Sequence, residues 1–469
     1  MLAKRAIKSV LFCTILMFLL NAAYRVLSWK DTAGEYYSSV NSFYDLDENL
    51  VDVLFLGSSH CYCSINNSLL WNDYGIASFS LAISGQDLVS TYHTLVEALK
   101  TQEPDVVCVE MYYAATGGYH VLGNLYRNTL PFRLSVNSFE AVQTMVKDDD
   151  PLDYWLKWPI IHTRYAELQR EDFQSEFPPY IGYQGGFYTQ SVWGAAPYQE
   201  QEPIPVSEEN EQYIRKIIDL AKKEGIELCF FVAPYAADEA AQGMFRYVEE
   251  IARENNVDFL NLTRSREGLS LDLDTDFTDW AHTNYYGAEK VTSYMGDYLL
   301  SNYALPDRRG DDRYGLWEED ATARQHEVQN YQILLQTTDV RDYLGYIGSL
   351  ERYTFIVSTK GSYLSEEVDL SASLQTAGIG EEFFDGHHVW VFEDRELTYL
   401  SDGEAFLHYD TLGYSEYVVN GTQENPIVHI DRVEYCAVAD GINIVVYDNA
   451  LGKVVDSVGF SGQQYTLVR

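Results

Sequence analysis

The sequence is short of cysteine and of basic residues, and each shortage excludes a class of protein. Six cysteines in 469 residues are few for an exported chain, and with Cys13 in an apolar run the remaining five cannot all pair in disulfides. The 32 basic residues stand against 71 acidic ones, a formal net charge of −39. Such a surface repels nucleic acid, so no nucleic-acid partner is expected. A hydrophobic content of 46% excludes a mostly disordered chain.

Long hydrophobic runs are also scarce, because only one occurs, from Ser9 to Tyr24. Three basic residues precede it, which predicts a cytoplasmic N-terminus and an extracytoplasmic bulk. The run is shorter than the usual span of roughly 20 residues. Two interpretations therefore remain open. Residues 1–30 are either a retained signal anchor or a cleaved signal peptide that releases a secreted chain. With no second span, we expect a single-pass protein of the cell membrane at most.

Strand and helix patterns alternate from residue 50 onward. The pattern predicts strands at 50–56, 76–82, 105–111, 226–233 and 257–262, and helices at 69–74, 88–100, 208–224 and 238–255, with a last helix ending near 302. This alternation is typical of a three-layer α/β/α domain with a parallel sheet. We assign it to residues 31–304, with a polar stalk at 31–49. The aromatic-rich stretch 113–203 is predicted to be an insertion over the carboxyl edge of the sheet.

The pattern changes after a charged segment at residues 305–316. We predict that residues 305–329 are a linker and the start of a helix over 318–335, and that 330–469 form a smaller, β-rich α+β domain. Predicted strands lie at 353–358 and 388–392, followed by a hairpin over 442–460. The hairpin sequence resembles a circularly permuted ILEI/PANDER-like domain, a module in which some members bind carbohydrate. Its tyrosines at 409, 414, 417 and 435 are candidates for stacking on sugars.

Two short motifs carry the chemistry. Gly57-Ser58-Ser59-His60 closes the first predicted strand, and Asp279-Trp280-Ala281-His282 precedes the last helix. Active sites of open α/β sheets lie at the carboxyl ends of the strands, so both motifs are expected at one edge. Together they supply a nucleophile, a base and an orienting carboxylate for acyl transfer. His60, Cys61 and Cys63 lack a second Cys/His cluster, so neither a metal nor a cofactor is predicted.

The order of these motifs resembles the SGNH (GDSL-type) hydrolase superfamily over roughly residues 50–302. The resemblance implies Ser59 as the nucleophile, in preference to Ser58, with Asp279 and His282 completing the triad. It also implies that the backbone amides of Ser59 and Gly85 bind the oxyanion.

The family's Gly-x-Asn-Asp motif is replaced here by the residues of 110–113, Glu-Met-Tyr-Tyr, so its oxyanion Asn is missing. This departure, the Gly-Ser-Ser variant and the N-terminal anchor resemble the exported branch that includes DltD of teichoic-acid D-alanylation and the alginate acetyltransferases. That branch implies an extracytoplasmic serine O-acyltransferase or esterase acting on a cell-envelope polysaccharide or teichoic-type polymer. It also implies a membrane-bound O-acyltransferase as a partner.

Three further residues are candidates for substrate binding. Gln86 and Tyr112 lie beside the implied site, and Arg164 could bind a polymer anion unless it forms an ordinary ion pair. The competing hypothesis is a non-catalytic surface-binding or assembly protein with a degenerate SGNH fold. The missing Asn favours that alternative, whereas the three triad residues speak against it.

Overall fold

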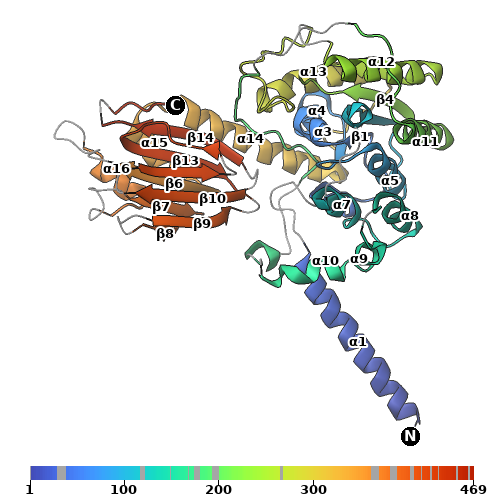
Figure 1. Ribbon diagram of the computed structural model, residues 1–469, viewed down its shortest axis with the longest axis horizontal. Helices are drawn as coiled ribbons and strands as arrows, with labels where there is room; N and C mark the ends of the chain where they lie inside the picture. The colour runs from blue at the N-terminus through green and yellow to red at the C-terminus, as the bar shows by residue number, and fades with distance from the viewer. Residues whose placement is uncertain are drawn as a thin grey trace.

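The computed structural model has two lobes, from the first of which a single long helix projects (Figure 1). It describes residues 2–28, 38–116, 122–147, 149–166, 168, 170–173, 180–192, 200–264, 268–360, 369–380, 388–401, 406–412, 415–422, 425–430, 433–449, 453–462 and 465–469. The projecting helix is α1 (Leu2–Leu27). Its stretch Ile7–Leu27 has 21 residues with a mean hydropathy of 2.0 and none of it is buried, so it is longer than the run expected from sequence and long enough to cross a membrane.

The first lobe is built on a parallel sheet in the order β2-β1-β3-β4-β5. The strands are β1 (Val53–Gly57), β2 (Ser78–Ala82), β3 (Val106–Glu110), β4 (Glu227–Val232) and β5 (Asp258–Asn261). Nearly every position in the first four strands is buried, as expected for strands covered on both faces. All five predicted strands are confirmed. The chain passes from β1 to β2 on one side and then to β3 on the other, so the topological switch point lies at β1. Ligand crevices of such sheets form at this point.

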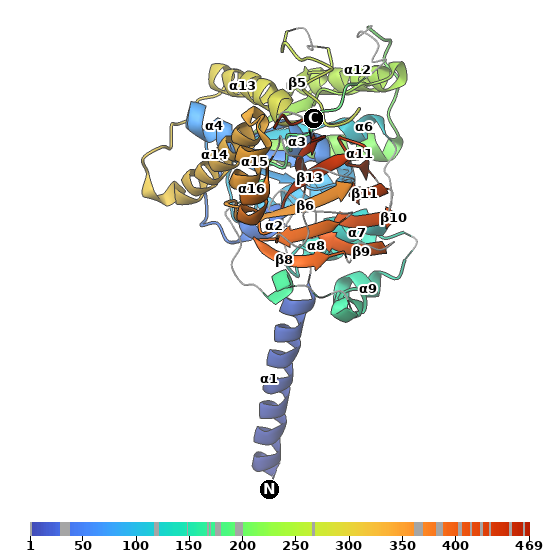
Figure 2. The ribbon, with the colours of Figure 1, turned by 90° about the vertical axis from the view of Figure 1, so that its left-hand side faces the viewer.

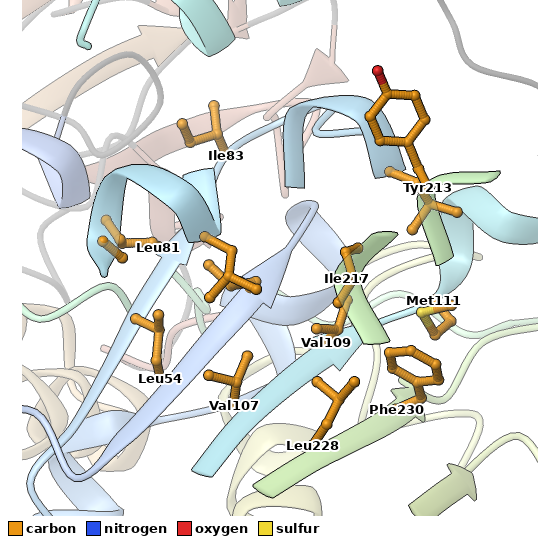
Figure 3. Close-up of a cluster of buried hydrophobic side chains, with 14 of the residues drawn as sticks. Leu54, Leu81, Ile83, Val107, Val109, Met111, Tyr213, Ile217, Leu228 and Phe230 are labelled. Atoms are coloured by element: carbon orange, nitrogen blue, oxygen red, sulfur yellow. The ribbon is translucent and has the colours of Figure 1, made fainter. Parts of the chain in front are cut away.

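Helices cover both faces of this sheet, which confirms the predicted three-layer α/β/α architecture. One face packs against α5 (Leu88–Ala98), α11 (Glu208–Glu224) and α12 (Glu239–Glu254). Figure 3 shows part of this core, with strand residues such as Leu54, Val107 and Phe230 below Ile217 of α11. The other face packs against α3 (Ser59–Ser64), α4 (Asn67–Tyr74) and α13 (Tyr285–Asn302).

Two expectations for the first lobe are corrected. The described part of the predicted stalk belongs to the lobe, because α2 (Ser38–Tyr44) buries Phe43 against Phe79. The predicted insertion is largely helical. It comprises α6 (Tyr112–Ala115), α7 (Leu122–Thr129), α8 (Val136–Met145), α9 (Pro151–Leu156) and α10 (Trp158–Ile161), then the 3-10 turns η1 (His162–Ala166) and η2 (Arg170–Phe173).

Among the described helices of the insertion, α6 directly follows β3 at the carboxyl edge of the sheet, whereas α8 and α10 pack elsewhere. Helix α8 packs along α5, where Asn137 bonds His93 at 2.8 Å, and α10 packs against α1. Asn128 of α7 does approach that edge, where its side chain lies 3.5 Å from the Ser84 carbonyl oxygen.

The second lobe is the predicted β-rich α+β unit. One sheet has the order β14-β13-β6-β7-β8 and the other β12-β11-β10-β9. The strands are β6 (Tyr353–Lys360), β7 (Val389–Glu393), β8 (Glu396–Leu400), β9 (Phe406–Leu412), β10 (Ser415–Thr422), β11 (Asn425–Ile430), β12 (Val433–Glu434), β13 (Gly441–Asp448) and β14 (Lys453–Phe460). The predicted hairpin is confirmed as the antiparallel pair β13–β14, although residues 450–452 of its turn lie outside the described part. The five-stranded sheet packs on the other sheet with one face and on α15 (Val340–Ile347) and α16 (Ser371–Thr376) with the other.

The helix predicted over 318–335 is confirmed, but the charged residues before it do not form a free linker between the lobes. Arg308 forms a bidentate ion pair with Asp52 at the start of the central sheet, with the shortest N–O distance 2.6 Å. Helix α14 (Gly315–Gln336) follows, and Trp317 is fully buried in the core of the first lobe, where its indole N–H donates to the Ser78 carbonyl at 2.7 Å. Farther along α14, Tyr331 packs into the core of the second lobe. Residues 305–336 are therefore a shared structural element, because they complete one core and enter the other.

Candidate active site

The turn after β1 directs two neighbouring serines differently. Gly57 has a φ of +147°, and a Cβ there would lie 2.6 Å from the Cβ of Glu110, so the turn requires glycine. Ser58 caps α3 and is buried, with its Oγ 3.4 Å from Oε2 of Glu110. Ser59 is the first residue of α3 and is only half-buried. Of the two serines, Ser59 is the more accessible.

Ser59, His282 and Asp279 form one hydrogen-bonded chain. The Oγ of Ser59 lies 2.8 Å from Nε2 of His282. The other ring nitrogen, Nδ1, lies 2.9 Å from Oδ2 and 3.0 Å from Oδ1 of Asp279. The structure thus brings together the three residues that the sequence pattern named as a triad, although 223 positions separate the serine from the histidine.

The loop that carries Asp279 and His282 is held from two sides. Asn284 caps α13, and its backbone amide donates to the carbonyl of Asp276 at 3.0 Å. The hydroxyl of Thr283 donates to the carbonyl of Cys63 in α3, also at 3.0 Å. Because α3 begins with Ser59, this second bond fixes the loop relative to the serine.

The carboxylate of Asp279 is stabilised in its ionised form. Burial pushes its pKa upward, but the hydrogen bonds from the His282 ring and from the amides of Ala281 and His282 outweigh burial, so the pKa lies below its ordinary value. The carboxylate is therefore negative at neutral pH. It can hold the imidazole in one tautomer and stabilise the positive charge that forms when the ring accepts a proton.

His60 lies against this triad, and sequence reasoning missed its place in the site. Its ring stacks on Tyr112 at 3.7 Å between centroids and lies 5.0 Å from the ring of His282. Burial, and then the proximity of His282, hold the pKa of His60 well below its ordinary value, so the ring is neutral. The ring of Tyr112, which was predicted to bind substrate, thus contacts His60, and the ring of His60 lies in turn beside that of His282. The only sequence signal was the position of His60 directly after the serine motif.

Glu110 was noted only as a departure from the family pattern, yet it lies under the serine turn. Its carboxyl is buried and accepts hydrogen bonds from the amide of Tyr112 at 2.9 Å and from the hydroxyl of Ser58. Burial raises its pKa to about 8, although these bonds and those from the Met111 and Ala233 amides act in the opposite direction. The carboxyl is therefore mostly protonated at neutral pH, so little negative charge lies beneath Ser59.

The loop after β2 carries the residues predicted to bind the oxyanion and substrate. The Ile83 amide donates to the Gly57 carbonyl at 3.1 Å, so this loop lies beside the end of β1. Gly85 has a φ of +71°. Gln86 is buried, and its Oε1 has no hydrogen-bond partner in the described part of the chain. The roles of Gly85 and Gln86 stay predictions.

Arg164 has the ion-pair role that was the alternative to substrate binding. It is buried, with Nη2 2.9 Å from Oδ1 of Asp172 and Nη1 2.8 Å from the carbonyl oxygen of Leu27. Figure 1 shows this segment beside the base of α1 and separate from α3. Its guanidinium serves the junction with α1 and is not part of the serine site.

A cavity of about 710 Å³ lies between the lobes, and its wall includes Thr275 and Asp276, which precede Asp279 in the chain, but none of the three triad residues. Tyr188 and Tyr435, one from each lobe, meet there edge to face with centroids 6.5 Å apart. Two wall cations are paired with carboxylates. Lys290 lies 2.6 Å from Asp276, and Arg469 lies 3.1 Å from Asp456. Of the other tyrosines proposed to stack on sugars, Tyr417 is buried in the core, Tyr409 is exposed, and Tyr414 lies outside the described residues.

Comparisons with known proteins identify similar folds only. No family model matches the chain, and no curated protein is similar to it in sequence. Similar solved structures include a protein described as an acylhydrolase from Bacteroides fragilis (10% identity, TM-score 0.29, 56% of this chain and 95% of that one). A GDSL-like lipase from Bacteroides thetaiotaomicron has 12% identity and a TM-score of 0.28 over 56% of this chain and 96% of its own. A family two carbohydrate esterase from Clostridium thermocellum has 10% identity and a TM-score of 0.25 over 55% and 65%. These values carry no argument about activity.

Proposed function

We propose that the protein is a serine-dependent O-acyltransferase or esterase that works outside the cytoplasm on a cell-envelope polysaccharide. The observation that carries this proposal is the chain of hydrogen bonds from Ser59 Oγ to His282 Nε2 at 2.8 Å and from His282 Nδ1 to Asp279 at 2.9 Å. A serine hydroxyl needs an adjacent base to become a nucleophile, and the base needs a third group to orient it.

In the proposed mechanism His282 Nε2 takes the hydroxyl proton as Ser59 Oγ bonds to the carbonyl carbon of an acyl ester. The carbonyl π electrons move to oxygen, and the amides of Ser59 and Gly85 are proposed to bind that oxyanion. His282 then protonates the leaving alcohol, which leaves the acyl group on Ser59. An incoming water or sugar hydroxyl gives its proton to His282 and takes the acyl group in a second addition and elimination.

Two features of the surroundings support this chemistry. The ionised Asp279 stabilises the imidazolium during each proton transfer. The protonated state of Glu110 at neutral pH keeps a full negative charge away from the position where the oxyanion would form, since a carboxylate beneath Ser58 would oppose it. The segment of residues 110–113 that replaces the family's Gly-x-Asn-Asp motif is thus compatible with an oxyanion held by backbone amides.

The cavity between the lobes supports a polysaccharide as the substrate. Its wall combines aromatic faces, at Tyr188, Tyr286 and Tyr435, with paired charges and hydroxyl groups. Pockets of this kind, largely apolar with a few fixed polar groups, suit ligands that need both stacking and hydrogen bonds. Thr275 and Asp276 of its wall belong to the same loop as Asp279, although Ser59, Asp279 and His282 do not themselves line the cavity.

Helix α1 supports the proposed location. If it is retained as a single-pass anchor with a cytoplasmic N-terminus, both lobes lie outside the membrane. An enzyme held at the membrane surface could receive acyl groups from a membrane-bound O-acyltransferase, which is the partner we propose. A released esterase would instead pass the acyl group to water.

The competing proposal is a surface-binding or assembly protein that has lost catalysis. It is favoured by one observation, the replacement of the family's oxyanion Asn by the buried Glu110 segment. The cavity between the lobes would serve such a protein equally well.

Labelling with a fluorophosphonate probe distinguishes the two proposals. We expect the wild-type protein to be labelled and to hydrolyse small acetyl esters, and Ser59→Ala to lose both. Ser58→Ala is the matched control one residue away, and it should keep a measurable part of each. Full esterase activity in folded Ser59→Ala would overturn the assignment, and no labelling of folded wild-type protein would favour the binding protein.

A further inference from the structure

Large apolar side chains are exposed along the segment from α8 to η2, whose last elements, α10, η1 and η2, contact α1. We call this set of seven residues the anchor-side face. It spans only 40 positions of the chain, from the turn before α8 to η2. Its members are Leu134, Val136, Phe139, Leu152, Leu156, Tyr165 and Phe173, and all are at least 49% exposed. Scattered exposed apolar residues are normal, but a group of this density on one region marks an interaction surface.

The face adjoins the helix that can cross a membrane. Tyr24 of α1 packs edge to face on Trp158 of α10, with centroids 6.4 Å apart, and Arg164 bonds the Leu27 carbonyl. Phe139 of α8 stacks on Trp155 of α9 at 4.1 Å, which joins the two helices into one surface. Figure 1 shows α9 and α10, and Figure 2 shows α9, at the end of the lobe from which α1 projects.

We propose that the anchor-side face lies in the lipid interface, so that the first lobe rests on the bilayer and does not swing freely on its anchor. When α1 spans the membrane, the end of the lobe that surrounds its base necessarily meets the lipid headgroups. Apolar side chains exposed at that level leave water for the boundary with the acyl chains. Tryptophan and tyrosine, as at Trp155, Trp158 and Tyr165, are the residues typical of this depth.

The charges of this region fit a lipid surface without net charge. Residues 133–173 contain five basic residues against eight acidic ones, so no excess of positive charge favours an anionic surface. Those with described side chains are Arg133, Lys147, Lys157 and Arg164 against Glu140, Asp149, Asp150, Asp153 and Asp172. The most buried cations are already engaged. Lys157 donates to the carbonyls of Leu130 and Phe132, and Arg164 pairs with Asp172. Binding should therefore depend on the apolar side chains and change little with anionic lipid or salt.

The proposal is independent of catalysis, and a depth measurement on the full-length chain tests it. Single cysteines are introduced at Leu134, Leu156 and Phe173 and labelled with an environment-sensitive fluorophore in phosphatidylcholine vesicles. Leu300→Cys and Ile204→Cys are the controls, because these exposed apolar positions lie away from the face; at 44% and 39% they are less exposed than the face positions, so greater shielding of the face cannot come from burial in the protein. The parent chain carries Cys13→Ser and Cys436→Ser, which removes the exposed and half-buried native thiols. Unchanged thermal unfolding shows that each labelled protein is folded.

The fluorophores on the face should be quenched by brominated lipid, at a depth of roughly 5–10 Å, and shielded from aqueous iodide by roughly threefold or more relative to the two controls. Equal iodide quenching at face and control positions would place the face in water and overturn the proposal. Shielding from iodide without quenching by brominated lipid would also overturn it, since the face would then be covered by a protein, either a second copy or a partner. A change in the shielding of the face when anionic lipid is added to the vesicles would contradict the expectation that its contact with lipid is independent of charge.

Discussion

Replacing Glu110 by glutamine should stabilise the protein more at high pH than at low pH. The carboxyl is buried beneath the serine turn, and burial raises its folded pKa to about 8 from an ordinary value of 4.5. Between these two values the unfolded chain has lost this proton while the folded chain keeps it. The free energy of unfolding therefore falls as the pH rises through this window, by up to about 1.4 kcal/mol per pH unit.

The magnitude follows from the two pKa values. The cost of keeping Glu110 in the fold is about 1 kcal/mol at pH 5 and about 3 kcal/mol at pH 7, and it reaches about 5 kcal/mol above pH 8. Glutamine does not ionise, and its carbonyl can still accept the amide hydrogen of Tyr112. The two side chains also differ in stability by an amount that does not depend on pH. The free energy of unfolding of Glu110→Gln relative to wild type should nevertheless rise by about 2 kcal/mol between pH 5 and pH 7.

Urea unfolding followed by tryptophan fluorescence measures this difference, because Trp71 and Trp317 are buried in the core of the same lobe. Glu103→Gln is the matched control, an exposed glutamate just before the other end of β3. Its effect on the urea midpoint should be equal at both pH values. An advantage of Glu110→Gln that stays constant from pH 5 to pH 7 would refute the reasoning, since the carboxyl would then be ionised in the folded protein.

Three further changes test other parts of the structure. His60→Ala should lower kcat for acetyl esters by roughly 10- to 100-fold, because the ring that supports His282 is lost. His60→Phe should retain much of the wild-type kcat. Equal loss in both variants would show that a ring nitrogen is needed. Trp317→Ala should destabilise the first lobe by about 3–5 kcal/mol in urea, since this residue of α14 fills its core; an unchanged midpoint would restore the linker interpretation. Tyr188→Ala and Tyr435→Ala should weaken binding to cell-wall polysaccharide in a pull-down and leave small-ester hydrolysis unchanged; unchanged binding would exclude the cavity as the polymer site.

The sequence alone predicted the layers of the first lobe and the pattern of the second. Buried parallel strands are continuous apolar runs, and amphipathic helices between them have their own periodicity, so both are visible locally. The serine and histidine motifs were visible for the same reason, since each sits at the end of an element. Their proximity was an inference from the rule that parallel strands end at one edge, and the structure brings Ser59 and His282 within 2.8 Å.

Sequence reasoning failed where charge was taken as a sign of exposure. The segment 305–316 looked like a solvated linker because it is rich in Asp and Arg, yet Arg308 is matched to Asp52 across 256 positions of the chain. The same limit applies to Arg164, whose partners are Asp172 and the carbonyl of Leu27. A charged side chain can be buried when it pairs with a group of opposite charge, and only the tertiary structure determines which groups pair.

What the sequence predicted by itself was therefore the class of most elements, the residues proposed to perform acyl transfer, and an N-terminal apolar helix. The tertiary structure decided which hydroxyl of Ser58 and Ser59 meets the imidazole, and that His60 and Glu110 belong to the same site. It also decided that α14 belongs to both lobes and that seven apolar side chains between residues 134 and 173 are exposed in a segment that contacts α1. The physical reason is range: periodicity and turn chemistry act between neighbours in the chain, whereas burial, pKa and the distance between two catalytic atoms depend on contacts between residues far apart in it.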